Sequence, residues 1–187
     1  MADFAAARLN MVDSQVRTQD VTDVRLQDTM GVLERERFVP ADRTHLAYAD
    51  IEVEYAPGRW LLKPRDVSKL LQALRPMPGE RALAISAPYA AAVMQALGVS
   101  VTHAEAGQAL PSGVFDLVVC EGAVGRAPQA WTQAIAVDGR MGVVERDGPV
   151  GKACLYNRSA GEVGRRELFD SFSPVLAGFE SHHGFAL

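Results

Sequence analysis

The chain has 187 residues, a net charge of −4 and no long basic run, which argues against nucleic-acid and membrane-surface partners. It is 48% hydrophobic and 22% charged, so it can bury a core of normal size, and its length suits a single domain over residues 1–187. The two cysteines, Cys120 and Cys154, lie far apart in apolar surroundings, which favours reduced core thiols in a cytoplasmic protein with neither a secretory signal nor a membrane span.

The first 75 residues are predicted to form a mainly helical extension. Apolar residues recur there at helical spacing, and Asp3 and Thr22 are suited to cap two of the helices. In chain order the pattern predicts a helix over 3–17, a helix from 22 to 38, a short helix or turn over 41–47, an extended pair around Pro57-Gly58 within 50–64, and a helix over 65–74.

Residues 76–187 alternate between strand and helix patterns and are predicted to form an α/β core. The expected elements are a strand over 81–85, a helix over 88–97, a strand over 99–105, a loop over 106–113, a strand over 114–120, a helix over 128–137, a strand over 140–145, and strands over 152–158 and 165–172 joined by a turn at 159–161. This alternation predicts a mostly parallel sheet with helices on both faces, and the apolar strand 114–120 is expected near its centre.

The stretch 80–98 has the form of a strand, a turn and a helix, in the place where a nucleotide-cofactor fold carries its glycine loop. Pro88 suits the first turn of the helix and Gly98 the position just past its end. The turn between strand and helix is Ser86-Ala87-Pro88, which contains no glycine. A glycine loop permits a tight turn and close approach of the backbone to a ligand, and neither is expected here.

Several short segments occur in order and with the spacing of one known family. They are Met11-Val12, Gln15-Val16-Arg17, and residues 20–23, 34–40 and 47–50, while 151–158 with 168–170 is similar to a shorter bacterial subgroup. On these segments the chain resembles the protein-L-isoaspartate O-methyltransferase family over nearly its whole length. The resemblance implies a Rossmann-like methyltransferase fold, S-adenosylmethionine as cofactor and isoaspartyl carboxylates as substrate.

The cofactor loop departs from the pattern of that family. The family has an acidic residue at the end of the strand, then G-x-G-x-G, then tyrosine. Tyr89 keeps the tyrosine position, but Ala84 stands in place of the acid, and Ser86, Ala87 and Pro88 replace a longer glycine run. A side chain and a proline at this turn should fill space and remove a hydrogen-bond donor. A plain strand-to-helix turn is the favoured interpretation.

Two further departures concern the substrate segment and one edge of the sheet. Family members carry a Thr-x-Ser-x-Pro-like segment that contacts substrate. Here its place is taken by five residues of which only the proline matches, Trp60, Leu61, Leu62, Lys63 and Pro64. Packing is their favoured role, and a reshaped apolar pocket is the alternative. The family has a further helix and strand after the position of Glu105, and this chain lacks them. From the usual size of such elements, about 25 residues are missing. Their loss would leave 99–105 as the edge strand, where Thr102 and His103 would discourage pairing with another chain.

A few other residues are candidates for a site. Glu105 ends its strand, where an acid can hold ribose hydroxyls, although a solvated charge is the favoured interpretation. Cys120 and Glu121 follow the central strand on the ligand side of such a sheet, where a buried thiol and a helix-capping acid are favoured. His182 and His183 are interpreted as tail residues, with adventitious metal binding as the alternative, since neighbours on an extended chain face opposite ways and cannot readily share one metal. We predict no metal site and no catalytic side chain.

Three functions are compatible with these residues. The preferred one is a family member without methyl transfer and with no expected cofactor, acting as a binding or assembly module for a protein partner or as a homodimer. The alternative is an active methyltransferase in which S-adenosylmethionine contacts Ser86, Ala87, Tyr89, Glu105 and Glu121. The third is a pocket for a different small molecule, with Trp60 and Tyr89 as its apolar walls.

Overall fold

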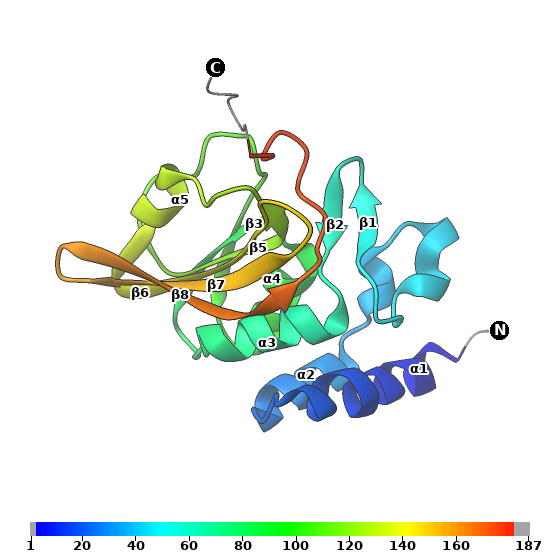
Figure 1. Ribbon diagram of the computed structural model, residues 1–187. Coiled ribbons are helices and arrows are strands. Elements are labelled where there is room, and N and C mark those ends of the chain that lie inside the picture. The colour runs from blue at the N-terminus through cyan, green and yellow to red at the C-terminus, as the bar shows by residue number, and fades with distance from the viewer. Residues whose placement is uncertain (1–2, 182–187) are drawn as a thin grey trace, which may run out of the picture.

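The computed structural model describes residues 3–181, and in this range a six-stranded sheet forms the centre of the molecule (Figure 1). The strands lie in the order β4-β3-β5-β6-β7-β8. Their bounds are β3 Arg81–Ile85, β4 Ser100–Ala104, β5 Phe115–Val124, β6 Ile135–Glu145, β7 Gly151–Ser159 and β8 Glu162–Ser171. The four strands β4, β3, β5 and β6 are parallel neighbours, and β7 and β8 continue the sheet as antiparallel strands. The predicted α/β class is therefore confirmed.

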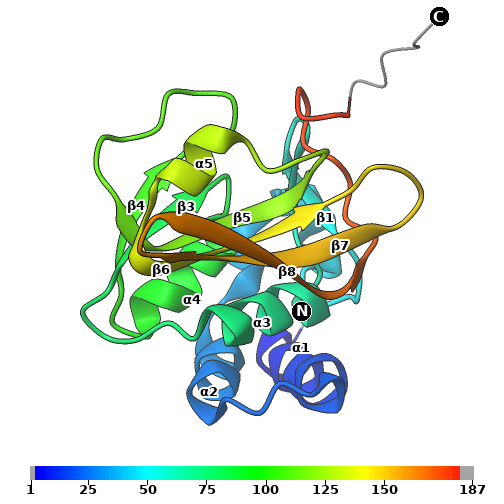
Figure 2. The ribbon, with the colours of Figure 1, turned by 60° about the vertical axis from the view of Figure 1, so that its left-hand side comes forward.

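Helices cover both faces of the sheet (Figures 1 and 2). Helices α3 (Pro64–Leu74) and α4 (Pro88–Ala96) pack on one face, and α1 (Phe4–Met11) and α2 (Val24–Val32) pack outside them. The short helix α5 (Gln129–Gln133) lies on the other face. Successive residues of a strand point to opposite faces of the sheet. Ala82 and Ala84 therefore belong to the core under α3 and α4, while Leu83 and Ile85 belong to the core on the α5 face. This is the Rossmann-like arrangement that the resemblance implied.

The predicted edge of the sheet is also confirmed. Strand β4 pairs with β3 alone and lies at the end of the strand order. Thr102 and His103 are exposed on it, as expected for an edge protected by polar groups.

The hairpin and short helix that precede α3 match their predictions. Strands β1 (Val53–Ala56) and β2 (Arg59–Leu61) pair in antiparallel fashion across Pro57-Gly58. A 3-10 helix spans Ala41–Leu46.

The first two helices differ from their predictions in extent and capping. Helix α1 ends at Met11 and continues as a π-helix over Val12–Val16 and a 3-10 turn over Arg17–Gln19. In this irregular part Thr18 Oγ1 donates to Ser14 O at 2.6 Å, a side-chain bond that competes with regular helix geometry.

The second helix begins and ends inside its predicted range. Asp23, and not Thr22, is its cap, because Asp23 Oδ1 accepts from the N–H groups of two residues of the first turn. The helix ends at Val32 rather than near residue 38, and a separate 3-10 helix spans Arg35–Phe38. The break allows the side chain of Arg35 to enter the core, where it is fully buried.

The predicted helix over 128–137 is wrong in its second half. Helix α5 ends at Gln133, and β6 begins at Ile135, five residues before the predicted strand. The cause is tertiary, because residues from Ile135 onward pair with β5 instead of continuing the helix. Phe115 pairs with Ile135, and an irregularity in the register follows. Within that irregularity Asp138 adopts φ +63°. Strand β5 itself runs on to Val124, past the predicted end at Cys120.

Candidate functional site

The turn that joins β3 to α4 lies at the carboxyl end of the parallel strands and is buried. Ser86 and Ala87 expose only 2% and 3% of their surface. Ser86 has φ +43°, a left-handed conformation that favours glycine, and its N–H donates to Ala104 O at 2.8 Å. The chain therefore keeps a sharp turn at this position while placing a hydroxymethyl side chain on it.

Ser86 and Glu105, two of the candidate cofactor residues, are bonded to each other. Ser86 Oγ donates to Glu105 Oε2 at 2.8 Å and accepts from Ala106 N at 2.9 Å. Arg59 completes the network: its Nη2 donates to Ala106 O at 2.8 Å, and its Nε lies 3.8 Å from Glu105 Oε2. The Glu105 side chain is 53% exposed, so this ion pair contributes little stability. One carboxylate oxygen of Glu105, the acid expected to hold ribose hydroxyls, is therefore already hydrogen-bonded within the chain.

Glu121 caps helix α4 from the neighbouring strand. It is fully buried, and its Oε2 accepts from Tyr89 N and Ala90 N, each at 3.0 Å. Burial raises its pKa to about 7, while the Arg35 guanidinium and these N–H groups oppose the rise. Ala87, the residue that precedes the helix, has no side-chain acceptor. Glu121 therefore satisfies the free N–H groups of the first turn, which matches the capping role favoured by the sequence.

A buried arginine packs on the ring of Tyr89. Arg35 Nε donates to Ala47 O at 2.8 Å, and its Nη2 donates to Leu62 O at 2.6 Å. The guanidinium carbon lies 4.5 Å from the centre of the Tyr89 ring. Tyr89 is fully buried, which raises its pKa, and its hydroxyl has no hydrogen-bond partner among residues 3–181. In the sequence, Arg35 stands within the matching segment 34–40, and no local pattern indicates this role.

The residues of the predicted substrate segment lie at the end of β2 and the start of α3. Leu61 and Leu62 are fully buried, and Trp60 packs against the core on the α5 face of the sheet. Lys63 precedes α3, and its carbonyl accepts from two N–H groups of the first turn. Pro64 is the first residue of the helix. The segment carries no hydroxyl group, and among its five residues the one neutral side-chain donor is the indole N–H of Trp60.

A C-terminal strap, residues 173–181, crosses the carboxyl end of β5 (red in Figure 1). Leu176 N donates to Ala123 O at 2.7 Å, and Leu176 is fully buried. A Cβ added to Gly122, which has φ +93°, would come within 2.5 Å of Leu176 Cδ2. Further along the strap, the ring of Phe179 packs on Trp131 with ring centres 5.4 Å apart. The strap covers the edge where α/β sheets bind ligands, and no pattern in the sequence predicted it.

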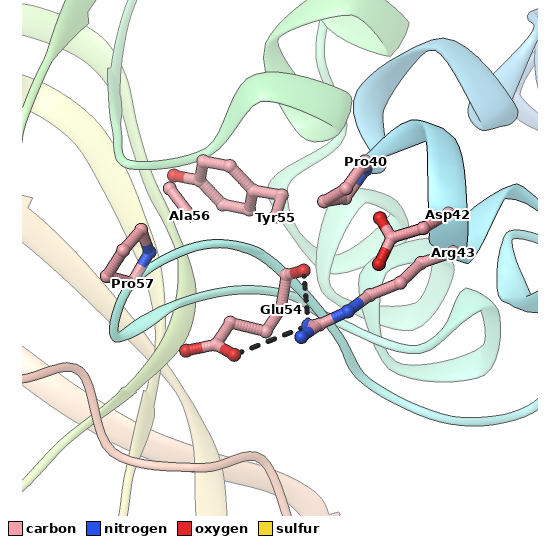
Figure 3. A pocket seen from close by; sticks show the side chains of 7 residues that line it. All are labelled: Pro40, Asp42, Arg43, Glu54, Tyr55, Ala56 and Pro57. Atoms are coloured by element: carbon pink, nitrogen blue, oxygen red, sulfur yellow. Dashed lines mark hydrogen bonds and ion pairs between the residues drawn. The ribbon is translucent and has the colours of Figure 1, made fainter.

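A cavity of about 310 Å³ opens between the β1–β2 hairpin and the preceding 3-10 helix (Figure 3). Its lining residues are Pro40, Asp42, Arg43, Glu54, Tyr55, Ala56 and Pro57. Arg43 Nη1 donates to Glu54 O at 3.0 Å and to Glu54 Oε2 at 3.3 Å, and Glu54 Oε1 accepts from Gly58 N. The hydroxyl of Tyr55 points away from this ion pair (Figure 3). The charged groups in the cavity thus serve mainly to hold the hairpin.

Other candidates from the sequence remain structural. Cys120 and Cys154 are both buried and form no disulfide, and burial raises the pKa of Cys154 to about 11. Among residues 3–181 no cluster of three or more His, Cys, Asp or Glu side chains could hold a metal ion. In the same range no helix is long and apolar enough to cross a bilayer. His182 and His183 lie outside the described residues.

Comparison with known proteins identifies relatives along most of the chain. A protein-L-isoaspartate O-methyltransferase of Methylorubrum populi is 30% identical, with 92% of this chain and 96% of the relative aligned. Proteins of the same name from Roseiflexus sp. and Koribacter versatilis are 28% and 25% identical, aligned over 94% and 92% of both chains. The Methylorubrum populi alignment spans 206 residues, more than the 187 of this chain, so this chain has gaps in it. No family model matches.

Solved structures show the same fold. A protein-L-isoaspartate O-methyltransferase of Plasmodium falciparum, in complex with S-adenosyl-L-homocysteine, superimposes with a TM-score of 0.73 at 14% identity over 90% of this chain and 97% of that one. A second structure of that name gives a TM-score of 0.72 at 15% identity, over 91% of this chain and 66% of that one.

Proposed function

The chain belongs to the protein-L-isoaspartate O-methyltransferase family, and we propose that it no longer transfers methyl groups and acts as a binding or assembly protein. The observation that carries this proposal is the burial of the Ser86–Ala87 turn by groups of the chain itself. A cofactor site needs its binding groups unoccupied, and here the Ser86 hydroxyl is already bonded to one oxygen of Glu105 and to the N–H of Ala106.

The residues present at this edge do not fit S-adenosylmethionine. A nucleoside cofactor requires a bare turn for close approach and a free acid for its ribose hydroxyls. The turn carries the side chain of Ser86, and one carboxylate oxygen of Glu105 is held by that hydroxyl and by Arg59. Trp60 and Leu176 add apolar side chains to the same end of the sheet. A ligand would have to displace these groups, at the cost of their hydrogen bonds and burial.

Titration calorimetry with S-adenosylhomocysteine and radiolabelled methyl transfer to an isoaspartyl peptide test the proposal together. We expect no heat of binding and no transfer, with the Methylorubrum populi relative as positive control. Micromolar binding of S-adenosylhomocysteine would contradict the proposal and support the alternative of an active enzyme. In that case Glu105→Gln should weaken binding, while His103→Gln, on the same edge of the sheet, should leave it unchanged.

Self-association through the α1–α2 face is the assembly role we propose. A groove of about 390 Å³ runs between these helices, with Leu9 58% exposed and Val32 73% exposed. Asp13, Arg17 and Asp28 lie along it. Arg17 Nη1 pairs with Asp13 at 2.7 Å within one copy, and a two-fold axis can place its remaining N–H groups near Asp28 of the other copy. A second copy of the chain is therefore the occupant to which we commit.

A further inference from the structure

Another cavity lies at the amino ends of the parallel strands, at the opposite end of the sheet from the Ser86 turn. It measures about 520 Å³ and is lined by Ala73, Arg75, Met77, Asp138, Arg140, Leu155, Asn157 and Arg166. The strand register gives this position of the cavity. Arg140 on β6 pairs with Leu117 on β5, and Leu117 pairs with Ala82, near the start of β3.

The cavity exists because the sheet extends beyond the end of α3. That helix stops at Leu74, whereas the β7–β8 hairpin continues past it (Figures 1 and 2). Arg140 is paired with Asn157, and Leu155 with Arg166, on three neighbouring strands. Because side chains alternate along a strand, these four side chains share the sheet face that α3 covers further on.

The charges around the cavity leave two guanidinium groups available. Arg140 is engaged: its Nη1 lies 2.6 Å from Glu80 Oε1, and it donates to the carbonyls of Leu74 and Arg75. It thereby offsets the negative end of the α3 dipole, which would otherwise repel an anion. Arg75 and Arg166 are exposed and make no side-chain hydrogen bond or ion pair with residues 3–181. Two uncommitted arginines on one cavity are suited to bidentate binding of a phosphate.

Backbone strain marks the same place. Four residues other than glycine have positive φ within residues 3–181, and two of them, Arg75 at +47° and Asp138 at +63°, line this cavity. Asp tolerates this conformation, but an arginine at the end of a helix takes a position that glycine fills more easily. Strained residues of this kind are frequent at ligand sites. An arginine in place of glycine at this position therefore indicates that its positive charge binds a ligand.

We propose that this cavity binds an organic phosphate of mononucleotide size. The phosphate lies between Arg75 and Arg166, and the apolar part of the ligand rests against Ala73 and Leu155. Asp138 and Asn157 accept hydrogen bonds from hydroxyl or amino groups of the ligand. The volume falls within the range of about 300–1,000 Å³ that is usual for small-molecule sites, and charged and apolar walls meet there as such an amphiphilic anion requires.

Calorimetric titration of the full chain with AMP, adenosine and inorganic phosphate tests the proposal. We expect saturable AMP binding, with adenosine and phosphate each at least about tenfold weaker, because each lacks one half of the contacts. Arg166→Gln and Arg75→Gly should each weaken AMP binding about tenfold. Arg75→Gly should also raise the melting temperature, since it relieves the positive φ, so its loss of binding cannot be due to misfolding.

The matched control is Arg126→Gln, which removes an exposed arginine at the carboxyl edge of the sheet. It should leave AMP affinity unchanged. The proposal is overturned by the absence of saturable AMP binding up to about 10 mM, by adenosine binding as tightly as AMP, or by an equal loss in Arg126→Gln. S-adenosylhomocysteine should not displace AMP bound in this cavity, so this proposal and the proposed function fail separately.

Discussion

At the scale of single residues, Ser86 combines a cost and a gain that mutation can separate. Its positive φ is unfavourable for serine, while its hydroxyl joins Glu105 to Ala106. Ser86→Ala keeps the strain and loses both bonds, so we expect it to lower the free energy of unfolding by about 1–3 kcal/mol. Ser86→Gly loses the same bonds but relieves the strain, so it should be less destabilising than alanine by about 1 kcal/mol.

Urea denaturation of the two variants beside the unmodified chain measures this difference. A glycine variant less stable than the alanine variant would show that the turn is not strained by its side chain. The comparison is internal, because both variants remove the same hydroxyl.

Glu121 makes stability depend on pH. Its pKa of about 7 in the folded chain exceeds the ordinary value of 4.5, so the folded state holds the proton more tightly than the unfolded state does. The contribution to stability is therefore full below pH 4.5 and is lost as the pH rises towards 7. At about 1.4 kcal/mol per pKa unit, the loss amounts to about 3 kcal/mol at most.

Glu121→Gln removes this dependence while keeping an acceptor for the N–H groups of α4. The unfolding free energies of both proteins are measured from pH 4.5 to 7.5. We expect the variant to lose less stability over this interval than the unmodified chain. Equal losses in the two proteins would show that Glu121 is not the titrating group. Burial opposes ionisation of Glu145, but its hydrogen bonds with Tyr156, Ala127 and Arg165 together lower its pKa; this residue is common to both proteins and cancels in the difference.

At the scale of elements, Leu176 is the fully buried apolar residue of the C-terminal strap. Leu176 is fully buried against Gly122, whereas Phe172, just before the strap, is 53% exposed. Leu176→Ala should lower the unfolding free energy by about 2–4 kcal/mol, because it removes apolar contacts and leaves a cavity. Phe172→Ala, the matched control, should change it by less than about 1 kcal/mol.

Hydrogen exchange gives this prediction a local readout. In Leu176→Ala the amide of Ala123, which bonds to Pro174 O, should exchange faster, while the amides at the centre of β6 remain protected. Unchanged protection at Ala123 would mean that the hydrogen bonds, and not the leucine, hold the strap in place.

At the scale of the whole molecule, the exposed α1–α2 face predicts a dimer. Val32→Glu places a charge in the groove and should shift the chain to monomer, because a desolvated carboxylate without a partner opposes association. The control is Val137→Glu, which adds the same charge at a valine that is 61% exposed on β6. Sedimentation velocity over a range of concentrations measures both. A wild-type chain that stays monomeric at every concentration would contradict the prediction.

Local patterns in the sequence determined the kinds of element and most of their order. The strand over 81–85 and the helix after Pro88 came from their apolar runs and their proline and glycine punctuation. The exposed edge over 99–105 followed from the missing segment and was confirmed. Short-range chemistry was enough for these features, because each depends on residues that are close in sequence.

Only the tertiary structure decided how the candidate site is filled. Ser86 meets Glu105 across 19 residues, Arg59 reaches Ala106 across 47, and Glu121 caps helix α4 through the N–H of Tyr89, 32 residues earlier. Pairings at such separations depend on strand order and on the path of the chain, which periodicity does not contain. The same reason explains the early start of β6 at Ile135, where pairing with Phe115 overrides the local preference for helix.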